Sequence, residues 1–113
     1  MDNYDKAEKA FVKALNRINV KENEKIVLEC KTPHWSFVFA LKIPRADIKA
    51  HEQVILESKD PEYCVAFSTD IPGANIEEHF KVILNSRDKM YLNYFIKNVN
   101  YKSTKVEEWL LYI

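Results

Sequence analysis

The side chains best suited to chemistry in this sequence are two histidines, His51 and His79, which occupy equivalent places in two similar stretches of the chain. Imidazoles bind zinc and transfer protons near neutral pH, so the pair suggests a metal site or an acid–base pair. Helices that pack side by side have axes about 8–10 Å apart, whereas two nitrogens bound to one zinc ion each lie about 2 Å from it. We therefore expect both imidazoles to pack between helices and to hydrogen-bond a backbone carbonyl.

The other reactive groups lack the spacing that catalysis or metal binding needs. Cys30 and Cys64 form no Cys-x-x-Cys pair, and we expect both to be reduced, small fillers of a cytoplasmic protein. The sequence contains no nucleophile elbow, phosphate-binding glycine loop or zinc-protease helix motif. It therefore predicts a protein that is not an enzyme and has no cofactor or metal. A small enzyme that uses His51 or His79 is the less favoured alternative.

The histidines belong to a sequence repeat whose period is the difference between their positions, twenty-eight. Residues 43–70 align on 71–98 without gaps with 12 identities, and residues 15–42 align on 43–70 with 8. A fixed period of this size is the signature of a repeat architecture. The sequence predicts one domain, 1–113, made of a half repeat (3–14), three full repeats (15–42, 43–70, 71–98) and a degenerate last half repeat (99–113).

Each repeat is predicted to hold two short helices, although residues 35–41 alone look like a strand because they are aromatic and β-branched. Capping residues recur once in every repeat, as in Asp60-Pro61, and a second set falls at Asn19, Asp47, Asn75 and Ser103. Four A helices are expected near 20–30, 48–58, 76–86 and 104–112, and four B helices near 3–17, 33–42, 61–70 and 89–98. Because short links make neighbouring helices antiparallel, the expected fold is all-α, a short α-solenoid of about eight antiparallel helices.

The repeat also predicts the core, because equivalent positions should be buried in each copy. In the A helices these sets are Val20/Ile48/Ile76, Ile26/Val54/Val82, Val27/Ile55/Ile83 and Cys30/Ser58/Ser86. In the B helices they are Trp35/Tyr63/Tyr91, Val38/Ala66/Tyr94 and Phe39/Phe67/Phe95, and Ile43, Ile71 and Val99 follow the helices.

Composition limits the function further. Seventeen basic and seventeen acidic residues give the 113-residue chain a formal net charge of zero. This balance, without a basic stripe, argues against electrostatic capture of nucleic acid. No apolar run approaches the roughly 18 residues of a membrane span, and the polar N-terminus is not a secretion signal. We expect a cytoplasmic protein with no membrane partner.

One face of the B helices differs between copies and is therefore free of the shared packing task. It reads His34/Phe37/Leu41, then Glu62/Val65/Thr69, then Met90/Asn93/Lys97. An exposed Phe37–Leu41 pair beside His34 would suit an anchor that binds a partner protein. The alternative is that the N-terminal helix covers these three residues.

Two further apolar positions suggest contacts beyond the repeat. Phe80 replaces the glutamates Glu24 and Glu52, so it contacts either the last helix or a partner. Trp109 begins an apolar C-terminal run, 109–113, which is either tucked into the chain or forms a homodimer contact.

The runs at residues 58–63 (SKDPEY) and 72–76 (PGANI) resemble helical repeats found in tandem in uncharacterised bacterial and phage proteins. The helix pairs are also similar in layout to HEAT repeats, although the period found here is short for that class. The resemblance covers about 15–98 and implies a binding scaffold with no catalytic residues. His51 and His79 depart from it, because such repeats usually place an aliphatic residue there.

The function we expect is a non-enzymatic module that presents a helical surface to a protein partner. A small phage or mobile-element protein that inhibits a host enzyme would fit this description. The alternative is nucleic-acid binding along a solenoid groove. It would require five basic residues to gather on one surface: Lys21, Lys25, Lys49, Lys81 and Arg87.

Overall fold

The computed structural model describes residues 2–99, and every regular element in that range is an α-helix. The seven helices are α1 (Asn3–Leu15), α2 (Val20–Cys30), α3 (Pro33–Lys42), α4 (Ile48–Ser58), α5 (Pro61–Asp70), α6 (Ile76–Ser86) and α7 (Lys89–Asn98). The all-α prediction is confirmed, and residues 35–41 are helical within α3. The helix expected near 104–112 lies outside the described residues.

The helix bounds repeat with the period of the sequence. The A helices α2, α4 and α6 start at Val20, Ile48 and Ile76, and the B helices α3, α5 and α7 start at Pro33, Pro61 and Lys89. These bounds match the predicted ones. Helix α1 is the exception, because it ends at Leu15 and not at residue 17. Arg17 and Asn19 have left-handed backbone, with φ of 62° and 42°, and such residues cannot continue a right-handed helix.

Capping side chains explain most of the helix starts. Asp60 Oδ1 accepts the backbone N–H of Glu62 at 3.0 Å, and Asp88 Oδ1 accepts that of Met90 at the same distance. Asp47 and Asn75 accept from Ala50 and Glu78 at 3.2 and 3.3 Å. These bonds satisfy amide groups that the first helical turn leaves without an internal partner.

Two of the predicted caps are wrong, because neither Asn19 nor Thr32 makes a side-chain capping bond. At the start of α2, Asn19 has left-handed backbone and not the extended backbone usual for an N-cap residue. The Asn23 side chain bonds this turn in its place, donating to the carbonyls of Ile18 and Asn19 at 2.9 and 3.1 Å. The first repeat therefore enters its A helix differently from the others.

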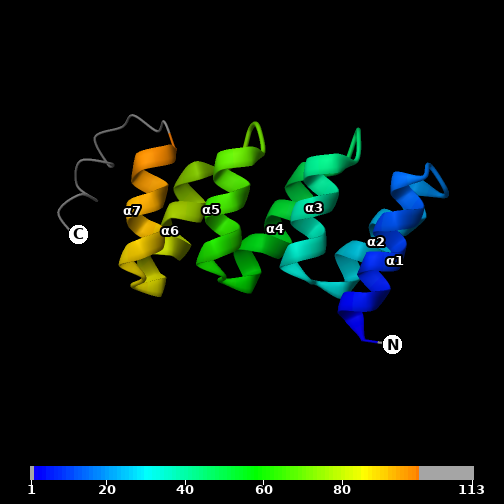
Figure 1. Ribbon diagram of the computed structural model, residues 1–113, viewed down its shortest axis with the longest axis horizontal. Coiled ribbons are helices and arrows are strands. Elements are labelled where there is room, and N and C mark those ends of the chain that lie inside the picture. The colour runs from blue at the N-terminus through cyan, green and yellow to red at the C-terminus, as the bar shows by residue number, and fades with distance from the viewer. Residues whose placement is uncertain (1, 100–113) are drawn as a thin grey trace. The chain divides into compact units, whose positions relative to one another are not determined.

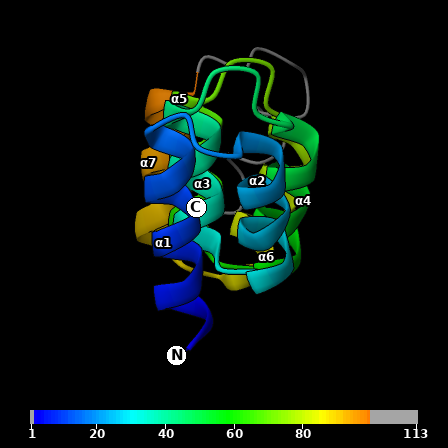
Figure 2. The same ribbon diagram turned by 90° about the vertical axis from the view of Figure 1, so that its right-hand side faces the viewer.

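Contacts divide the chain after Ser58 into two compact units, and unit 1 contains α1 to α4. In unit 1, α1 packs mainly on α2, and α3 packs mainly on α4. Figure 2 shows α1 and α3 on one side of this unit and α2 and α4 on the other. Each B helix of unit 1 therefore pairs most closely with the A helix that follows it in the chain.

Unit 2 contains α5, α6 and α7 among the described residues. Helix α5 packs on α6 and also on α7, and α5 and α7 run side by side in the same direction (Figure 1). This arrangement places the two B helices of unit 2 next to each other.

The predicted core is confirmed at its central positions. Phe39 and Phe67 are fully buried and Phe95 is 1% exposed, and the aliphatic set Val27, Ile55 and Ile83 is fully buried. In unit 1 a continuous cluster joins α1, α2, α3 and the turn after α3, and it consists of Ala10, Phe11, Ala14, Val27, Phe39 and Ile43. A buried phenylalanine and a buried branched aliphatic residue therefore recur in each of the three repeats.

Some predicted core positions are wrong. Ser58 and Ser86 are exposed, and each hydroxyl donates to the carbonyl three residues earlier at 2.6 Å. Such local bonds satisfy a serine at a helix end without burial. Tyr94 is also exposed, at 54%, although it was predicted to be buried with Val38 and Ala66.

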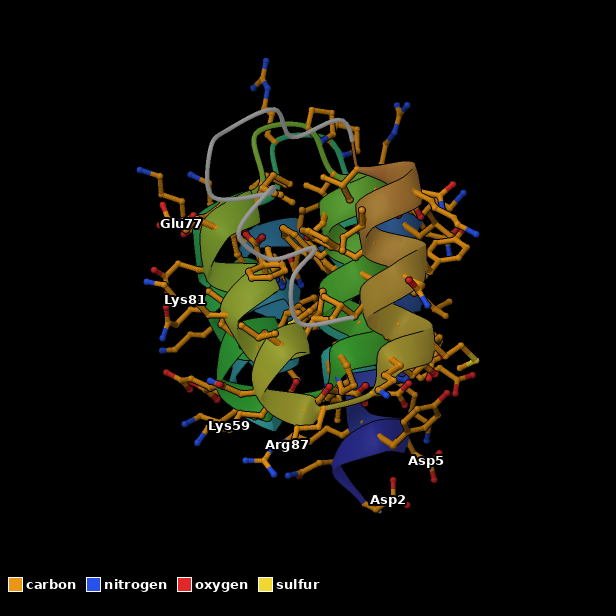
Figure 3. The ribbon with its side chains drawn as sticks, turned by 90° about the vertical axis from the view of Figure 1, so that its left-hand side faces the viewer. Asp2, Asp5, Lys59, Glu77, Lys81 and Arg87 are labelled. Carbon is orange, nitrogen blue, oxygen red and sulfur yellow. The ribbon has the colours of Figure 1, made fainter. Side chains whose placement is uncertain are left out.

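Left-handed backbone recurs at both kinds of turn. Lys31, Lys59 and Arg87 follow the A helices with φ of 52°, 56° and 59°, and Arg17, Arg45 and Gly73 occupy the other turns with φ of 62°, 62° and 80°. The side chains of Lys59 and Arg87 project outward from the molecule (Figure 3). A cation suits the negative end of a helix, but only glycine adopts this backbone without steric cost.

Replacing Phe67 by alanine should lower the free energy of unfolding by about 3–5 kcal/mol, because the ring is fully buried and its loss leaves a cavity. Tyr94→Ala is the matched control, and its effect should stay within about 1 kcal/mol because the ring is exposed. Urea unfolding followed by circular dichroism measures both. Equal losses in the two variants would contradict the assignment of Phe67 to the core.

The turn positions give a second stability prediction. Arg45→Gly should raise the free energy of unfolding by up to about 1 kcal/mol, because the left-handed strain is relieved at some cost in chain entropy. Gly73→Ala should lower it by about 1 kcal/mol, and the cost is confined to the backbone since no atom lies within 4 Å of the added Cβ. Urea midpoints that move in the opposite directions would refute the argument.

Candidate protein-binding groove

A groove of about 330 Å³ lies within unit 2, between α5 and α7. Its lining comes from both helices and consists of Glu62, Val65, Ala66, Thr69, Asp70, Met90, Tyr91 and Tyr94. Four of these residues, Glu62, Val65, Thr69 and Met90, belong to the face that the sequence analysis identified as variable between copies. The groove therefore includes the whole variable face of α5 but only Met90 from the variable face of α7.

The capped first turns of α5 and α7 set the register of the two helices that line the groove. Asp60 caps α5 and Asp88 caps α7, and the Asp88 carboxylate also accepts the backbone N–H of Tyr91 at 3.3 Å. The two helices therefore begin at equivalent positions of the repeat and present their first turns side by side. This register sets Glu62 on α5 and Met90 on α7 at the same end of the groove.

The groove combines a buried apolar base with exposed apolar edges. Val65 is 5% exposed, whereas Met90 is 65% exposed and Tyr94 is 54% exposed. Large apolar side chains exposed at the edge of a groove gain free energy when a partner buries them. Methionine is also flexible enough to fit partners of different shape.

The charge of the groove is negative. Its lining includes two carboxylates, Glu62 and Asp70, and no lysine or arginine. Partial burial raises the pKa of the Tyr91 hydroxyl, and the nearby carboxylates of Glu62, Asp88 and Asp60 raise it further. Tyr91 is therefore a neutral phenol at physiological pH, able to donate or accept a hydrogen bond at the groove surface.

The anchor predicted on α3 lies in unit 1 and is partly covered. The His34 ring stacks on Tyr4 of α1 at 5.8 Å and meets Trp35 edge-on at 4.6 Å, and His34 and Phe37 are both half-buried. Leu41 is 40% exposed. Helix α1 thus covers part of this face, as one of the two alternatives expected, and partner binding at this face remains a prediction.

The other two candidate contacts fall elsewhere. Phe80 is 1% exposed and its ring lies 5.7 Å from that of Phe95, so it contributes to the core of unit 2, and partner binding at Phe80 stays a prediction. Trp109 lies outside the described residues. The sequence missed Tyr91 and Tyr94 as groove residues because their positions in the repeat were assigned to the core.

His51 is buried beside a carboxylate and not beside a backbone carbonyl, so the predicted partner is wrong. Its Nε2 lies 2.9 Å from Glu24 Oε2, and the same oxygen accepts the backbone N–H of Asp47 at 2.8 Å. The ring also stacks on Phe39 at 5.0 Å. The Glu24 carboxylate therefore ties α2 to the start of α4.

His79 is likewise fully buried, and its ring lies 5.3 Å from that of Phe67. Both imidazoles thus pack against the phenylalanine that recurs in the core of each repeat. Among residues 2–99, no three His, Cys, Asp or Glu side chains gather in an arrangement that could hold a metal ion. Cys30 and Cys64 are both buried and neither forms a disulfide within residues 2–99, as predicted for small fillers.

The chain matches no protein-family model, no curated protein and no solved structure. The helices described for residues 2–99 include none that is long and apolar enough to cross a membrane. The groove and the buried histidines must therefore be interpreted from their own chemistry.

The buried His51 gives a prediction about pH. Burial lowers the pKa of its imidazole below the ordinary value of 6.5, although the hydrogen bond and charge of Glu24 and the charge of Asp47 oppose this shift. The His51 imidazole therefore binds a proton more tightly in the unfolded chain than in the folded chain. The stability of the fold is retained above about pH 6.5 and falls as the pH drops below it.

A thermal-melting series from pH 7.5 to pH 5.5 tests this prediction. The wild type should lose more stability across the range than His51→Gln, which keeps an N–H donor and cannot titrate. Parallel losses in the two proteins would show that protonation of His51 does not oppose folding.

Proposed function

We propose that the chain is a non-enzymatic protein-binding module that holds part of a partner protein in the groove between α5 and α7. The observation that carries this proposal is the exposure of Met90 and Tyr94 at the edges of an apolar concave surface. Protein interfaces favour such aromatic and methionine side chains around a central pocket.

The difference between repeat copies supports the same surface. Buried positions such as Phe39 and Phe67 keep the same residue, whereas the groove positions Glu62 and Met90 correspond to His34 in the first copy. Positions released from shared packing can vary to suit a partner without loss of the fold. A binding surface is expected on this face for that reason.

The fold that we propose is a short HEAT-like α-solenoid that works in the cytoplasm. Helix bounds that recur with the period of the sequence, and the repeated Phe–aliphatic core, support a stack of similar helix pairs. Solenoids of this type commonly act as binding scaffolds, so the fold favours the same function by analogy.

The alternatives receive less support from the described residues. Nucleic acid carries a dense negative charge, and Glu62 and Asp70 would repel phosphates from this groove. His51 is fully buried, so a substrate has no access to its imidazole. Both points favour a protein partner.

Site-specific photo-crosslinking tests the proposal. A benzophenone amino acid at position 94 should form a covalent adduct with one protein in the cells that make this chain, because the Tyr94 ring borders the groove. The matched control carries the same group at Val12 of α1, which is 45% exposed and lies in unit 1. The control should form no such adduct.

Competition shows whether the adduct is specific. An excess of unlabelled wild-type protein should abolish it, whereas an excess of Ala66→Arg, with a long cationic side chain in the groove lining, should not. Circular dichroism confirms that this variant folds. Absence of an adduct at position 94, or equal adducts at positions 94 and 12, would overturn the proposed function.

A further inference from the structure

The groove between α5 and α7 has a distribution of charge that restricts its partner. Glu62 lies in the first turn of α5 and Asp70 is its last residue, so both ends of the α5 edge carry a carboxylate. Their positions differ by eight, which corresponds to about 12 Å along a helix. Apolar side chains, including Val65 and Ala66, lie between.

Within residues 2–99, neither carboxylate forms an ion pair with a lysine or arginine. The Asp70 carboxylate has only a hydroxyl contact, from Thr69 Oγ1 at 3.2 Å. Lys89 and Lys97 of α7 are exposed and do not line the groove. The two negative charges are therefore available to a cationic partner.

Asp70 is also unfavourable for its own helix. The carbonyl groups at a helix C-terminus repel an anion, and the equivalent residues after one repeat on either side are Lys42 and Asn98. The repeat therefore does not require a carboxylate at this position. A charge that costs stability and serves no packing role is best explained by a partner that neutralises it.

We infer that the groove binds an amphipathic helix of a partner protein, with apolar side chains against Val65, Met90 and Tyr94 and lysine or arginine side chains paired with Glu62 and Asp70. This inference rests on the proposed function. A helix suits the groove because two helical turns span about 11 Å, close to the separation of the two carboxylates. Partly desolvated charge pairs of this kind would add specificity to the apolar contact.

Peptide binding tests the inference directly. The probe is a fluorescein-labelled amphipathic helical peptide with two lysines eight positions apart beside a leucine stripe, and the matched peptide has glutamates in place of those lysines. In fluorescence anisotropy the lysine peptide should bind at least tenfold more tightly, and its advantage should shrink as salt screens the charges. Equal affinities, or no binding of either peptide at millimolar concentration, would overturn the inference.

Variants of the two carboxylates locate the effect. The double variant Glu62→Gln/Asp70→Asn should lose about tenfold in affinity for the lysine peptide, whereas the control Glu22→Gln/Glu29→Gln, on α2 in unit 1, should keep the wild-type affinity. Asp70→Lys should bind the glutamate peptide better than the wild type does. Equal losses in the two double variants would show that net charge, and not the groove, attracts the peptide.

A stability measurement separates the effect of the Asp70 charge on folding from its effect on peptide binding. Asp70→Asn should raise the melting temperature by about 1–5 °C while it weakens peptide binding. A variant that lowers the melting temperature would give Asp70 a structural role and would remove the argument for a basic partner.

Failure of this inference can be distinguished from failure of the proposed function. If the crosslink from position 94 persists while Glu62→Gln/Asp70→Asn leaves its yield unchanged, the groove binds a partner whose charge is not the recognised feature. If the captured protein is a second copy of this chain, the basic-helix inference is wrong and the groove is a homodimer contact.

Discussion

The structure depends on one packing constraint, which buries a phenylalanine of each B helix and a branched aliphatic residue of each A helix through contact with neighbouring helices. Phe39 and Phe67 are fully buried, and so are Val27, Ile55 and Ile83. A helix as short as these buries too little apolar surface to be stable alone, so each needs this contact with its neighbours. This requirement explains the sequence repeat, because the repeat places the same type of side chain at the same buried position of each helix pair.

Around this fixed centre, the remaining positions of the repeat take different roles. The A-helix position held by Asn23, His51 and His79 is buried and polar, and in unit 1 the His51 imidazole with the Glu24 carboxylate connects α2 to the start of α4. The variable face of the B helices is buried to different degrees, from Val65 at 5% exposed to Met90 at 65%. In unit 2 it contributes to the α5–α7 groove, where apolar side chains and carboxylates face the solvent together.

The sequence predicted the helices more completely than it predicted the groove. Six helices have the expected bounds because caps such as Asp60 and Asp88 act locally, and because three copies of each signal removed the ambiguity of residues 35–41. The left-handed Asn19, the Glu24 partner of His51 and the exposure of Tyr94 were missed. The partner of His51 depends on which side chains of α2 and α4 meet, and Asn19 and Tyr94 differ from the equivalent residues of the other copies. A pattern shared by all the copies does not reveal such differences.

The most direct test of the central claim is to map where the natural partner touches unit 2. The partner protein identified by crosslinking is added stepwise to the wild-type chain. Amide chemical-shift changes in nuclear magnetic resonance spectra then report each residue separately. A groove that binds the partner predicts changes concentrated at Val65, Ala66, Tyr91 and Tyr94. Changes confined to α6, with α5 and α7 unaffected, would contradict it.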